Sequence, residues 1–556
     1  MSLSPDASST NERPTSFVYY SAAFAALNSA NLGYDIGINA SIGYRLQAEG
    51  GGVELSDVQL EAFMGVFSAF AIPGALFSYV LSDGIGRRRS FGVAAVVFIV
   101  GILVTISSSS LGVMLIGRAV MGLGVGFGSA MDPLYISELS PPQFRGQLVT
   151  WTETATNVGI LLGFAAGALF ERGDWVSNDA AWRIMLANGM VMPIILMLLV
   201  ATVMPESPRW LIASGYHEAA AGILQKCYAP GTDIEAIVAD IATDLTLELE
   251  FSKSVSWATI LCRPPPYLKR MLCVGVGVAV AQQLTGIESI QYYMLYILEA
   301  SGIKSRNTQF TYLLAVGALK VFVIVIAGRL FDHPRLGRRP LLMASNLGLC
   351  LALAMLMLSF LAGSHTDDDD DGSGSRGGGG NPAVAVLSLF LFVTSFSLGM
   401  GPGAWLIPAE VFSLAVRAKA MSFATFCNRT VAAAAAASFL SLRSLLQDWG
   451  VILLFSLLCM GNFVFVALLV PETKGKTLEE MRDYFEKSRF FCEGGDYGHM
   501  SIQNEGENAA QPSQNEGPRA AEEDSEEKPL RPEQTEDSSG SSSPANSVIN
   551  PLGRAL

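Results

Sequence analysis

Three short loop motifs occur twice in this chain, in the same order and about 250 to 270 residues apart. They begin at Asp83, Glu138 and Pro205, and they return at Asp332, Glu410 and Pro471. Each copy lies at the edge of a long apolar stretch. Membrane proteins built from two parallel repeats are typical of secondary transporters, whose substrate site lies near mid-membrane where the halves meet. The repeat therefore predicts the architecture and the position of the working site.

Apolar stretches long enough to cross a bilayer can be placed twelve times. Half of the residues are hydrophobic and only 15% are charged, whereas soluble proteins carry about a quarter charged residues. Runs of about 20 apolar residues span the ~30 Å hydrocarbon core. They lie near 17–44, 60–81, 91–108, 111–132, 148–170, 184–204, 271–298, 311–331, 340–362, 383–407, 420–442 and 451–470. We expect an all-α membrane protein in which twelve transmembrane helices form two six-helix, pseudo-symmetric halves, together with short cytoplasmic helices.

The spans and the basic loops divide the chain into five consecutive parts. Arg and Lys concentrate in alternate loops on one side, so positive-inside bias places these loops and both termini in the cytoplasm. The end of the chain is acidic and rich in Glu, Ser and Pro, so we expect disorder beyond about 494. The parts are a cytoplasmic N-terminal segment (1–16), an N-terminal bundle (17–204), a cytoplasmic helical linker (205–266), a C-terminal bundle (267–470) and a cytoplasmic tail (471–556). We expect the plasma membrane as the location, with the vacuolar membrane as the alternative, and the composition identifies no partner for the tail.

Two ionisable residues inside the apolar spans are the first functional candidates, because charges in a bilayer are costly. Asp35 lies ~15 Å below the outer end of the first span, and Arg118 lies ~10 Å below the outer end of the fourth. At these similar depths the two side chains can pair. A carboxylate whose cationic partner approaches and withdraws can act as a proton switch. The alternative is a permanent ion pair that only ties the two spans together.

A polar stripe in the seventh span supplies the candidate substrate site. Amides and carboxylates with aromatic neighbours suit a polyhydroxylated solute, which needs bidentate hydrogen bonds and a flat apolar surface. The helical spacing keeps much of this stripe near one face. The candidate substrate-binding residues are Gln282, Gln283, Glu288 and Tyr292 in the stripe, with Lys320, Trp405 and Asn428 in later spans. The alternative is that these polar groups only hold helices together. Glu153 in the fifth span has no assigned role.

The repeated loop residues form a third candidate set. Salt bridges at the cytoplasmic ends of the helices would favour one state of an alternating-access cycle if they exist only when those ends close. Individually, exposed pairs contribute only ~0–1 kcal/mol. The spacing pairs Asp83 with Arg87 and Glu138 with Arg145, seven positions later. The expected gating residues are Asp83, Arg87, Glu138, Arg145, Glu206, Arg209, Asp332, Arg338, Glu410 and Arg417. Static anchors for the loops are the alternative.

The residues that carry chemistry do not form an enzyme site. The sequence contains no nucleophile–base set, no cofactor loop and no cluster with metal-ligand spacing, so we expect no catalysis, no cofactor and no metal. The acidic run from Asp367 to Asp371 resembles the start of a calcium loop, but Gly378 stands where the bidentate Glu is needed. The expected partners are a small polyhydroxylated solute, a proton and the lipid bilayer, and not nucleic acid.

The chain resembles the sugar porter family of the major facilitator superfamily over roughly 17 to 485. The motifs that carry the resemblance are Pro205-Glu206-Ser207-Pro208-Arg209-Trp210, Gln282-Gln283-Leu284-Thr285-Gly286-Ile287, Gly401-Pro402-Gly403-Ala404-Trp405 and Pro471-Glu472-Thr473-Lys474-Gly475. The resemblance implies a twelve-helix bundle that moves hexoses, polyols or inositol by alternating access. It implies that Asp35 and Arg118 couple a proton to transport, and that Gln282, Gln283, Tyr292 and Trp405 contact sugar.

Within the family, the chain is most similar to the plant polyol and monosaccharide proton symporters. The similarity includes Gly33-Tyr34-Asp35-Ile36-Gly37, Lys320 and Asn428-Arg429. Ile160 and Glu288 replace the Gln and Asn of many hexose transporters, which argues against simple glucose specificity. The leading hypothesis is therefore proton-coupled symport of a monosaccharide, polyol or cyclitol. An uncoupled sugar uniporter and a non-transporting nutrient sensor are the alternatives.

Overall fold

Apolar helices dominate the structure because a chain in lipid must satisfy its main-chain hydrogen bonds within each span. The computed structural model describes residues 14–48, 53–141, 144–171, 177–254, 257, 260, 262, 264–331, 333, 336–364, 381–413, 416–476 and 478–487. These residues contain helices and no strand. Asp332, the acidic run near Asp367 and the tail beyond 494 lie outside the described residues.

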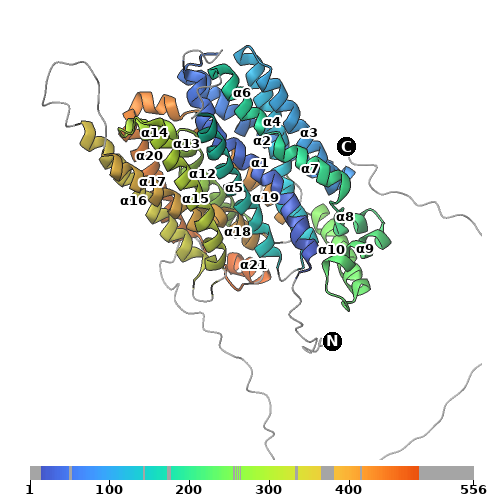
Figure 1. The fold of residues 1–556 in the computed structure, drawn as a ribbon. Helices are drawn as coiled ribbons and strands as arrows, with labels where there is room; N and C mark the ends of the chain where they lie inside the picture. Colours follow the sequence, from blue (N-terminus) through green and yellow to red (C-terminus); the bar gives the residue numbers. More distant parts are fainter. Residues whose placement is uncertain are drawn as a thin grey trace, which may run out of the picture. The chain divides into compact units, whose positions relative to one another are not determined.

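Seven helices make six membrane paths in the N-terminal half (Figure 1). They are α1 (Ser16–Gln47), α2 (Asp57–Ile85), α3 (Arg87–Ile106), α4 (Leu111–Leu139), α5 (Arg145–Glu171), α6 (Asn178–Asn188) and α7 (Val191–Thr202). The last two follow each other in one path of 25 residues. The fourth path extends seven residues beyond the stretch expected from hydropathy, since α4 continues through Pro133 to Leu139.

The C-terminal half also makes six paths. The seventh and tenth are each built from more than one helix, and α20 is kinked at Gln447, whose φ is 63°. Its helices are α12 (Pro266–Leu284), α13 (Ile287–Tyr292), α14 (Met294–Ala300), α15 (Arg306–Phe331), α16 (Arg338–Ser364), α17 (Pro382–Ser395), the π-helix η2 (Phe396–Met400), α18 (Gly401–Val411), α19 (Arg417–Ala436) and α20 (Phe439–Leu469). The seventh path breaks where Gly286 adopts a left-handed conformation with φ 77°. The single regular helix assumed for the polar stripe is therefore not present.

The expected all-α, twelve-helix architecture is confirmed. Within the described residues, ten helical paths are long and apolar enough to cross a membrane by length and composition. The remaining two, α1 and α19, are 32 and 20 residues long. Both are less apolar because they carry buried polar side chains, among them Asp35 and Asn428. Polar side chains thus concentrate on the helices that build the interior of the bundle.

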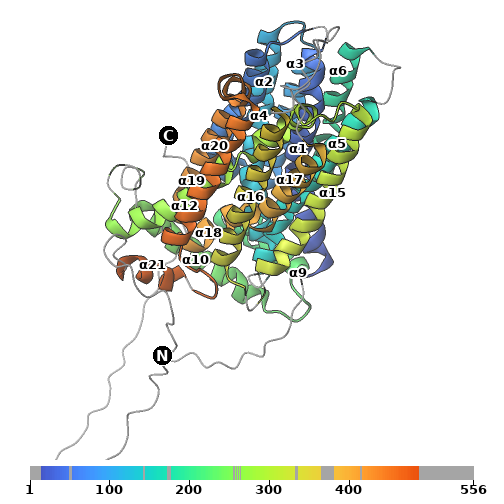
Figure 2. The ribbon, with the colours of Figure 1, turned by 90° about the vertical axis from the view of Figure 1, so that its left-hand side faces the viewer.

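Short helices mark one end of the bundle, which we call the basic end because the loops Gly86–Arg88 and Gly337–Arg339 lie there. Figure 2 shows α9 and α21 beneath the upright bundle, at this end. The short helices are α8 (Pro208–Ala213), α9 (His217–Cys227), α10 (Ile234–Ser254) and α21 (Leu478–Lys487). We call the opposite end, where α1 stops and α2 starts, the far end.

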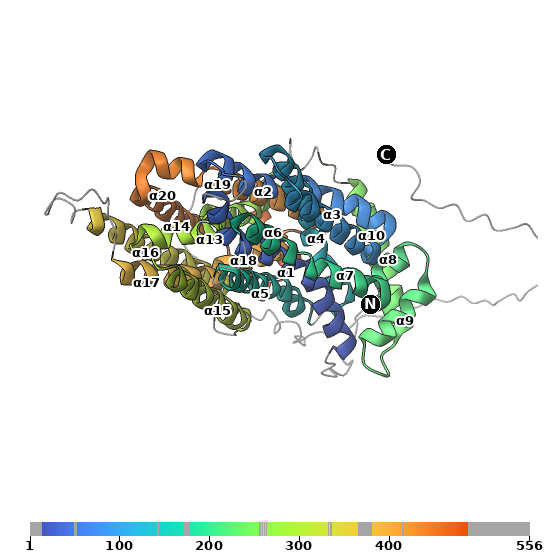
Figure 3. The same ribbon diagram turned by 45° about the horizontal axis from the view of Figure 1, so that its top comes forward.

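Close helix packing in the N-terminal half depends on glycine. A Cβ atom at Gly33 of α1 would lie 1.9 Å from the main-chain oxygen of Thr156, and one at Gly159 of α5 would lie 1.9 Å from that of Ala30. The main chains of α1 and α5 therefore touch, as small residues allow in membranes. Between the halves, α5 packs on α15 and α2 packs on α19 (Figure 3).

Candidate functional site

The two charges predicted to pair do so in the structure. Arg118 Nη1 donates to Asp35 Oδ1 at 2.6 Å, and both side chains are almost completely buried. The second carboxylate oxygen accepts a hydrogen bond from Asn39 Nδ2 at 2.8 Å. Asn39 lies one helical turn further along α1, so the i,i+4 spacing in the sequence already places it beside Asp35.

Arg118 is held by aromatic rings as well as by its ion pair. Its Cζ lies 4.7 Å from the centre of the Phe63 ring and 4.5 Å from that of Phe67. Its Nε donates weakly to the Phe63 carbonyl at 3.4 Å, while its Nη2 is buried without a hydrogen-bond partner. The guanidinium thus keeps cation–π contacts that do not depend on the Asp35 carboxylate. This arrangement permits the carboxylate to change its charge without leaving the cation wholly unsupported.

The predicted amide residues of the C-terminal half lie together. Gln282 Nε2 donates to the Gly401 carbonyl at 3.0 Å, and its oxygen accepts from Asn428 Nδ2 at 3.0 Å. Gln283 Nε2 lies 3.3 Å from Asn428 Oδ1 and 3.4 Å from Glu288 Oε1. The contacts of Gln283 are long, so this amide is loosely held and can turn toward a solute.

Four charged side chains surround these amides. Arg429 Nη1 pairs with Glu288 Oε1 at 3.2 Å, and Lys320 Nζ donates to Gln291 Oε1 at 3.1 Å. Glu153, on α5 of the other half, acts electrostatically on both Lys320 and Arg429. Glu288 Oε2 is buried without a partner. The cluster has two acids and two bases, so its formal charge is zero, and it offers a free carboxylate oxygen to a hydroxyl donor.

Tyr292 and Trp405 flank this cluster in different ways. Tyr292 is 1% exposed and lies at the end of the short helix α13, where both ion pairs, Asp35–Arg118 and Glu288–Arg429, act on it. It therefore lies between the two predicted sites. Trp405 is partly buried on α18, one turn after the carbonyl that accepts from Gln282.

At the basic end, the repeated motifs perform the same task in each half. Glu206 Oε1 accepts the main-chain N–H groups of Arg87 and Arg88 at 2.7 and 3.1 Å. In the second half, Glu472 accepts those of Arg338 and Arg339 at 2.8 and 3.1 Å. Each carboxylate thus caps the positive N-terminus of a helix.

The capping geometry explains the glycine that precedes each pair of arginines. A Cβ atom at Gly86 would lie 2.4 Å from Glu206 Oε2, and one at Gly337 would lie 2.0 Å from Glu472 Oε2. Burial raises the pKa of the Glu206 carboxyl, and hydrogen bonds from Ser207, Arg88 and Arg87 oppose that rise.

The expected gating residues form pairs inside each half. Arg87 binds Asp83 at 2.8 Å and Glu138 at 3.0 Å, and in the second half Arg338 binds Glu410 at 3.2 Å. Glu138 therefore pairs with Arg87 rather than with Arg145, the partner suggested by sequence spacing. These bridges join helices of one half, so they do not require closure between the halves. Of the other expected members, Arg145 and Arg417 begin helices α5 and α19, and Arg209 lies in the first turn of α8, while Asp332 lies outside the described residues.

Contacts between the halves at the far end were not predicted. Tyr296 of α14 donates its hydroxyl to Gln47 Oε1 of α1 at 2.6 Å. Arg306 of α15 stacks on the Tyr44 ring of α1, with its Cζ 3.3 Å from the ring centre. These contacts hold α1 against the C-terminal half, so the far end is closed.

A third contact joins α2 to α20 at the far end. Glu61 Oε1 accepts the main-chain N–H of Ser441 at 2.7 Å, and its other oxygen accepts the Ser441 hydroxyl. Glu61 is 2% exposed and lies at the edge of the apolar stretch expected for the second span. A charged residue at the end of an apolar stretch is common, so the sequence did not single out Glu61 as a contact between the halves.

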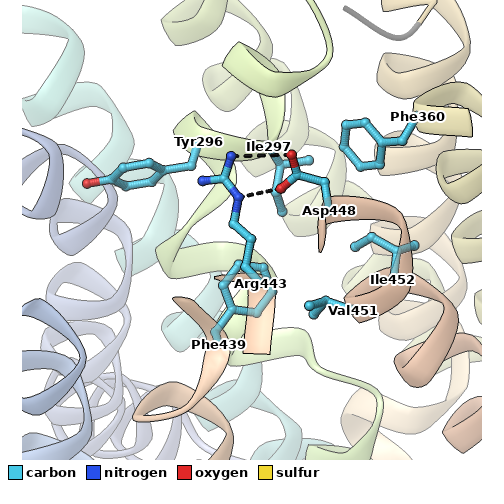
Figure 4. Close-up of a pocket in the computed structure, with 8 residues that line it drawn as sticks. All are labelled: Tyr296, Ile297, Phe360, Phe439, Arg443, Asp448, Val451 and Ile452. Atoms are coloured by element: carbon cyan, nitrogen blue, oxygen red, sulfur yellow. Dashed lines mark hydrogen bonds and ion pairs between the residues drawn. The ribbon is translucent and has the colours of Figure 1, made fainter. Parts of the chain in front are cut away.

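A small hollow behind Tyr296 is too small for a solute. Its volume is about 10 Å³, which is the space of a single water molecule. Figure 4 shows the Arg443–Asp448 ion pair at its centre and the Tyr296 hydroxyl pointing away from that pair. The other residues drawn in the hollow are Ile297, Phe360, Phe439, Val451 and Ile452. This region is packed shut.

A much larger cavity lies between the halves toward the basic end. Its volume is about 580 Å³, and α1, α5 and α15 line it. The lining includes Ala26 and Ala30 of α1, Trp151 of α5 and Arg329 of α15. A cavity of this size accommodates a small solute, but none of the predicted substrate-binding residues is among those that line it. The protein is therefore closed at the far end and hollow toward the basic end.

Comparison with known proteins gives a family match over most of the chain. The family model described as "Sugar (and other) transporter" matches residues 21–485. Probable polyol transporter 4 of Arabidopsis thaliana is 34% identical over 481 residues, which cover 86% of this chain and 87% of that protein. D-xylose-proton symporter-like 2 of the same plant is 30% identical over 476 residues, covering 82% and 89% of the two chains.

Solved structures give a corresponding result for the fold. The inward-open conformation of the xylose transporter XylE from E. coli matches with a TM-score of 0.69 and 25% identity, covering 84% of this chain and 99% of that one. The proton:xylose symporter XylE bound to 6-bromo-6-deoxy-D-glucose matches with a TM-score of 0.67 and 25% identity, and the match covers 84% of this chain and 99% of that one.

Proposed function

Because the chain belongs to the sugar transporter family, we propose that it carries one neutral monosaccharide, polyol or cyclitol together with a proton across a membrane. Transport proceeds by alternating access, in which the site opens first to the far end and then to the basic end. The basic end faces the cytoplasm, since it holds the repeated Arg and Lys loops. The chain is a transporter and not an enzyme.

The observation that carries proton coupling is the buried Asp35–Arg118 pair. At 2.6 Å and with side chains at most 2% exposed, the pair excludes water from its charges. Protonation of Asp35 removes the attraction between its carboxylate and Arg118. The Phe63 and Phe67 rings still support the guanidinium after the ion pair is lost. Tyr292 lies within electrostatic reach of both this pair and the Glu288–Arg429 pair of the substrate cluster. These contacts support a proton switch rather than a fixed tie.

The charges around the amides favour a neutral solute. A charged solute would leave uncompensated charge in a buried site whose own charges already cancel, at a cost of several kcal/mol. The partnerless Glu288 Oε2 needs a hydroxyl donor, and the loosely held Gln283 supplies both a donor and an acceptor. Polyols and cyclitols offer hydroxyls on every side. Relatives named as polyol transporters support the same class.

Reconstitution of the purified protein in liposomes tests this proposal. With an imposed proton gradient and a panel of labelled sugars, polyols and inositol, the wild type accumulates a solute above equilibrium and takes up protons with it. Asp35→Asn keeps solute exchange but loses accumulation, whereas Asp483→Asn on the exposed face of α21 keeps both. Solute equilibration without proton movement would identify an uncoupled uniporter instead. Binding without any flux would identify a sensor.

A further inference from the structure

A second carboxyl is buried in the α1–α4 interface, and the mechanism above does not use it. Asp132 of α4 is 0% exposed. Asn28 Nδ2 donates to both of its oxygens at 3.2 Å, and the Ser29 hydroxyl donates to Oδ2. All of these donors are neutral side chains of α1. Asp132 therefore lies against the same helix as Asp35, but without an arginine.

No cation compensates this carboxyl within the part of the chain that the structure describes. Helices α1, α2, α3, α5 and α8 pack against α4, and the groups that act on Asp132 are Asn28 and Ser29 alone. On α4 itself, Glu138 lies ~9 Å further along the axis and Arg118 lies ~21 Å back. Glu138 is already paired with Arg87. An ionised carboxylate in such a setting is costly, so the group binds a proton readily.

The neighbours of Asp132 can form hydrogen bonds with it whether it is ionised or protonated. As a carboxylate, it receives the Ser29 hydroxyl and the Asn28 amide. As a carboxylic acid, it can donate its proton to the Ser29 oxygen, because a hydroxyl rotates and both donates and accepts. The site can therefore load and unload a proton without any rearrangement of α1 or α4.

Asp35 lies in a row of buried polar side chains on α1, and this row reaches Asp132 of α4 through Asn28. Asn28, Asn31, Asp35 and Asn39 follow one another at i, i+3, i+7 and i+11, which places them on one helical face. Their relative exposures are 5%, 3%, 1% and 0%. The face points to α4, because Asn28 contacts Asp132 and Asp35 contacts Arg118. We call these four residues the α1 polar row.

Two acceptors in the row have no protein donor. Asn31 Oδ1 and Asn39 Oδ1 are buried and lack a hydrogen-bond partner, and they lie on either side of Asp35 along the helix. Buried polar atoms of this kind are usually bonded to ordered water. The row spans ~10 Å between Asp35 and Asn28, a distance that a few water molecules bridge. It runs from Asp35 toward the basic end.

We propose that Asp132 is a second proton-binding site of this transporter, and that it receives the proton of Asp35 along the α1 polar row and releases it toward the basic end. The Asp35 acid passes its proton through water beside Asn31 to the Asp132 carboxylate, which restores the Asp35–Arg118 pair. Asp132 then gives the proton to water from the basic-end side, because its contact Asn28 lies seven residues closer to that end of α1 than Asp35 does. The inference rests on the proposed proton coupling.

Infrared difference spectra between acidic and alkaline pH test the proton site without transport. Over a pH range above that in which exposed carboxyls titrate, the wild type should show carbonyl bands of buried protonated carboxyls, with one band from Asp132 and one from Asp35 among them. Asp132→Asn should remove one of them and Asp35→Asn the other, while Asp240→Asn on exposed α10 removes neither. A spectrum of Asp132→Asn that retains every band of the wild type overturns the proposal. If Asp35→Asn loses its band while Asp132→Asn keeps every band, proton binding at Asp35 stands and only the claim for Asp132 fails.

Transport in liposomes tests the relay. Asp132→Asn should keep solute exchange within about two-fold but slow proton-driven net uptake at least about ten-fold, as expected when a positioned proton-transferring group is lost. In the wild type, net uptake should rise as the pH on the basic-end side rises, because Asp132 then loses its proton more readily. In the variant this dependence should be flat. Wild-type net uptake and pH dependence in Asp132→Asn would overturn the relay.

Two further variants keep the test decisive if Asp132→Asn does not fold. Asp132→Glu keeps the carboxyl and should restore both the infrared band and the pH dependence. Asn31→Leu interrupts the polar row but leaves both carboxyls in place, so both bands should remain while net uptake falls as in Asp132→Asn. Normal net uptake in a folded Asn31→Leu protein would refute the path along α1.

Discussion

The hydrogen bond between Tyr296 and Gln47 should measurably stabilise the closed far end. The hydroxyl of Tyr296 reaches the Gln47 oxygen at 2.6 Å across the two halves, and Gln47 is oriented by its own bond to Asp57 at 2.7 Å. When the far end opens, water satisfies these groups, so the bond contributes only its net value of about 0.5–1.5 kcal/mol. Tyr296→Phe should therefore raise the ratio of far-open to far-closed molecules by roughly 2- to 13-fold, since 1.4 kcal/mol corresponds to a factor of about ten.

Spin labels across the far end give that ratio directly. Val58 of α2 and Leu445 of α20 are 67% and 77% exposed and lie on opposite halves, so labels there should not disturb packing. The distance distribution in a background without native cysteines should show a larger far-open population in Tyr296→Phe than in wild type. Tyr312→Phe on α15 of the same half is the matched control. Its hydroxyl makes none of the far-end contacts between the halves.

A double-mutant cycle decides whether the effect belongs to this bond. Gln47→Ala and Tyr296→Phe each remove the same interaction, so the double variant should open no further than Gln47→Ala alone. Equal far-open populations in wild type, Tyr296→Phe and Tyr312→Phe would refute the view that the contact favours closure. Fully additive effects of the two changes would also contradict it.

Three further perturbations follow from the same structure. Arg87→Ala leaves Glu138 buried and unpaired, so the protein should lose about 3–5 kcal/mol of stability and melt at a clearly lower temperature in detergent, whereas Arg482→Ala on exposed α21 should leave the melting temperature unchanged. Gly159→Val would drive side-chain carbon into the Ala30 oxygen and should abolish the monodisperse peak in size-exclusion chromatography, while Gly112→Ala, which meets no atom within 4 Å, should preserve it. Gln282→Ala removes an amide that bonds Gly401 and Asn428, so the apparent KM for the transported solute should rise roughly 2- to 13-fold. Trp405→Ala should also raise this KM, whereas Gln225→Ala at an exposed position should leave it unchanged. Normal saturation curves in both site variants would place the solute elsewhere.

Helical depth alone was enough to predict the Asp35–Arg118 pair. Both residues interrupt apolar runs, and the fixed rise per residue places them at similar depths. The same reasoning did not single out Asp132 and Glu61, because both lie at the ends of the expected apolar stretches rather than at their centres. In the structure α4 continues to Leu139, so Asp132 is inside the bundle and completely buried. A charge at the edge of an apolar stretch therefore deserves the same scrutiny as one at its centre.

Sequence spacing was less reliable for partners in the loops. The seven-residue separation of Glu138 and Arg145 is the same in the second copy, but Glu138 pairs with Arg87 from the preceding helix. The spacing from Gln282 to Tyr292 predicts that much of the stripe lies near one helical face, yet the left-handed Gly286 separates α12 from α13. Periodicity carries information only as far as a helix remains regular.

The amino-acid sequence by itself determined the number of spans, the two-fold repetition and the polar residues from which the site is built, because the bilayer imposes apolar length and makes every buried charge conspicuous. Only the tertiary structure decided that the four charges of Glu153, Glu288, Lys320 and Arg429 form one neutral cluster. It also decided that the far end is closed through Tyr296, Arg306 and Glu61. Such arrangements depend on how helices distant in the chain cross and pack against each other. The periodicity of a single segment does not encode these contacts.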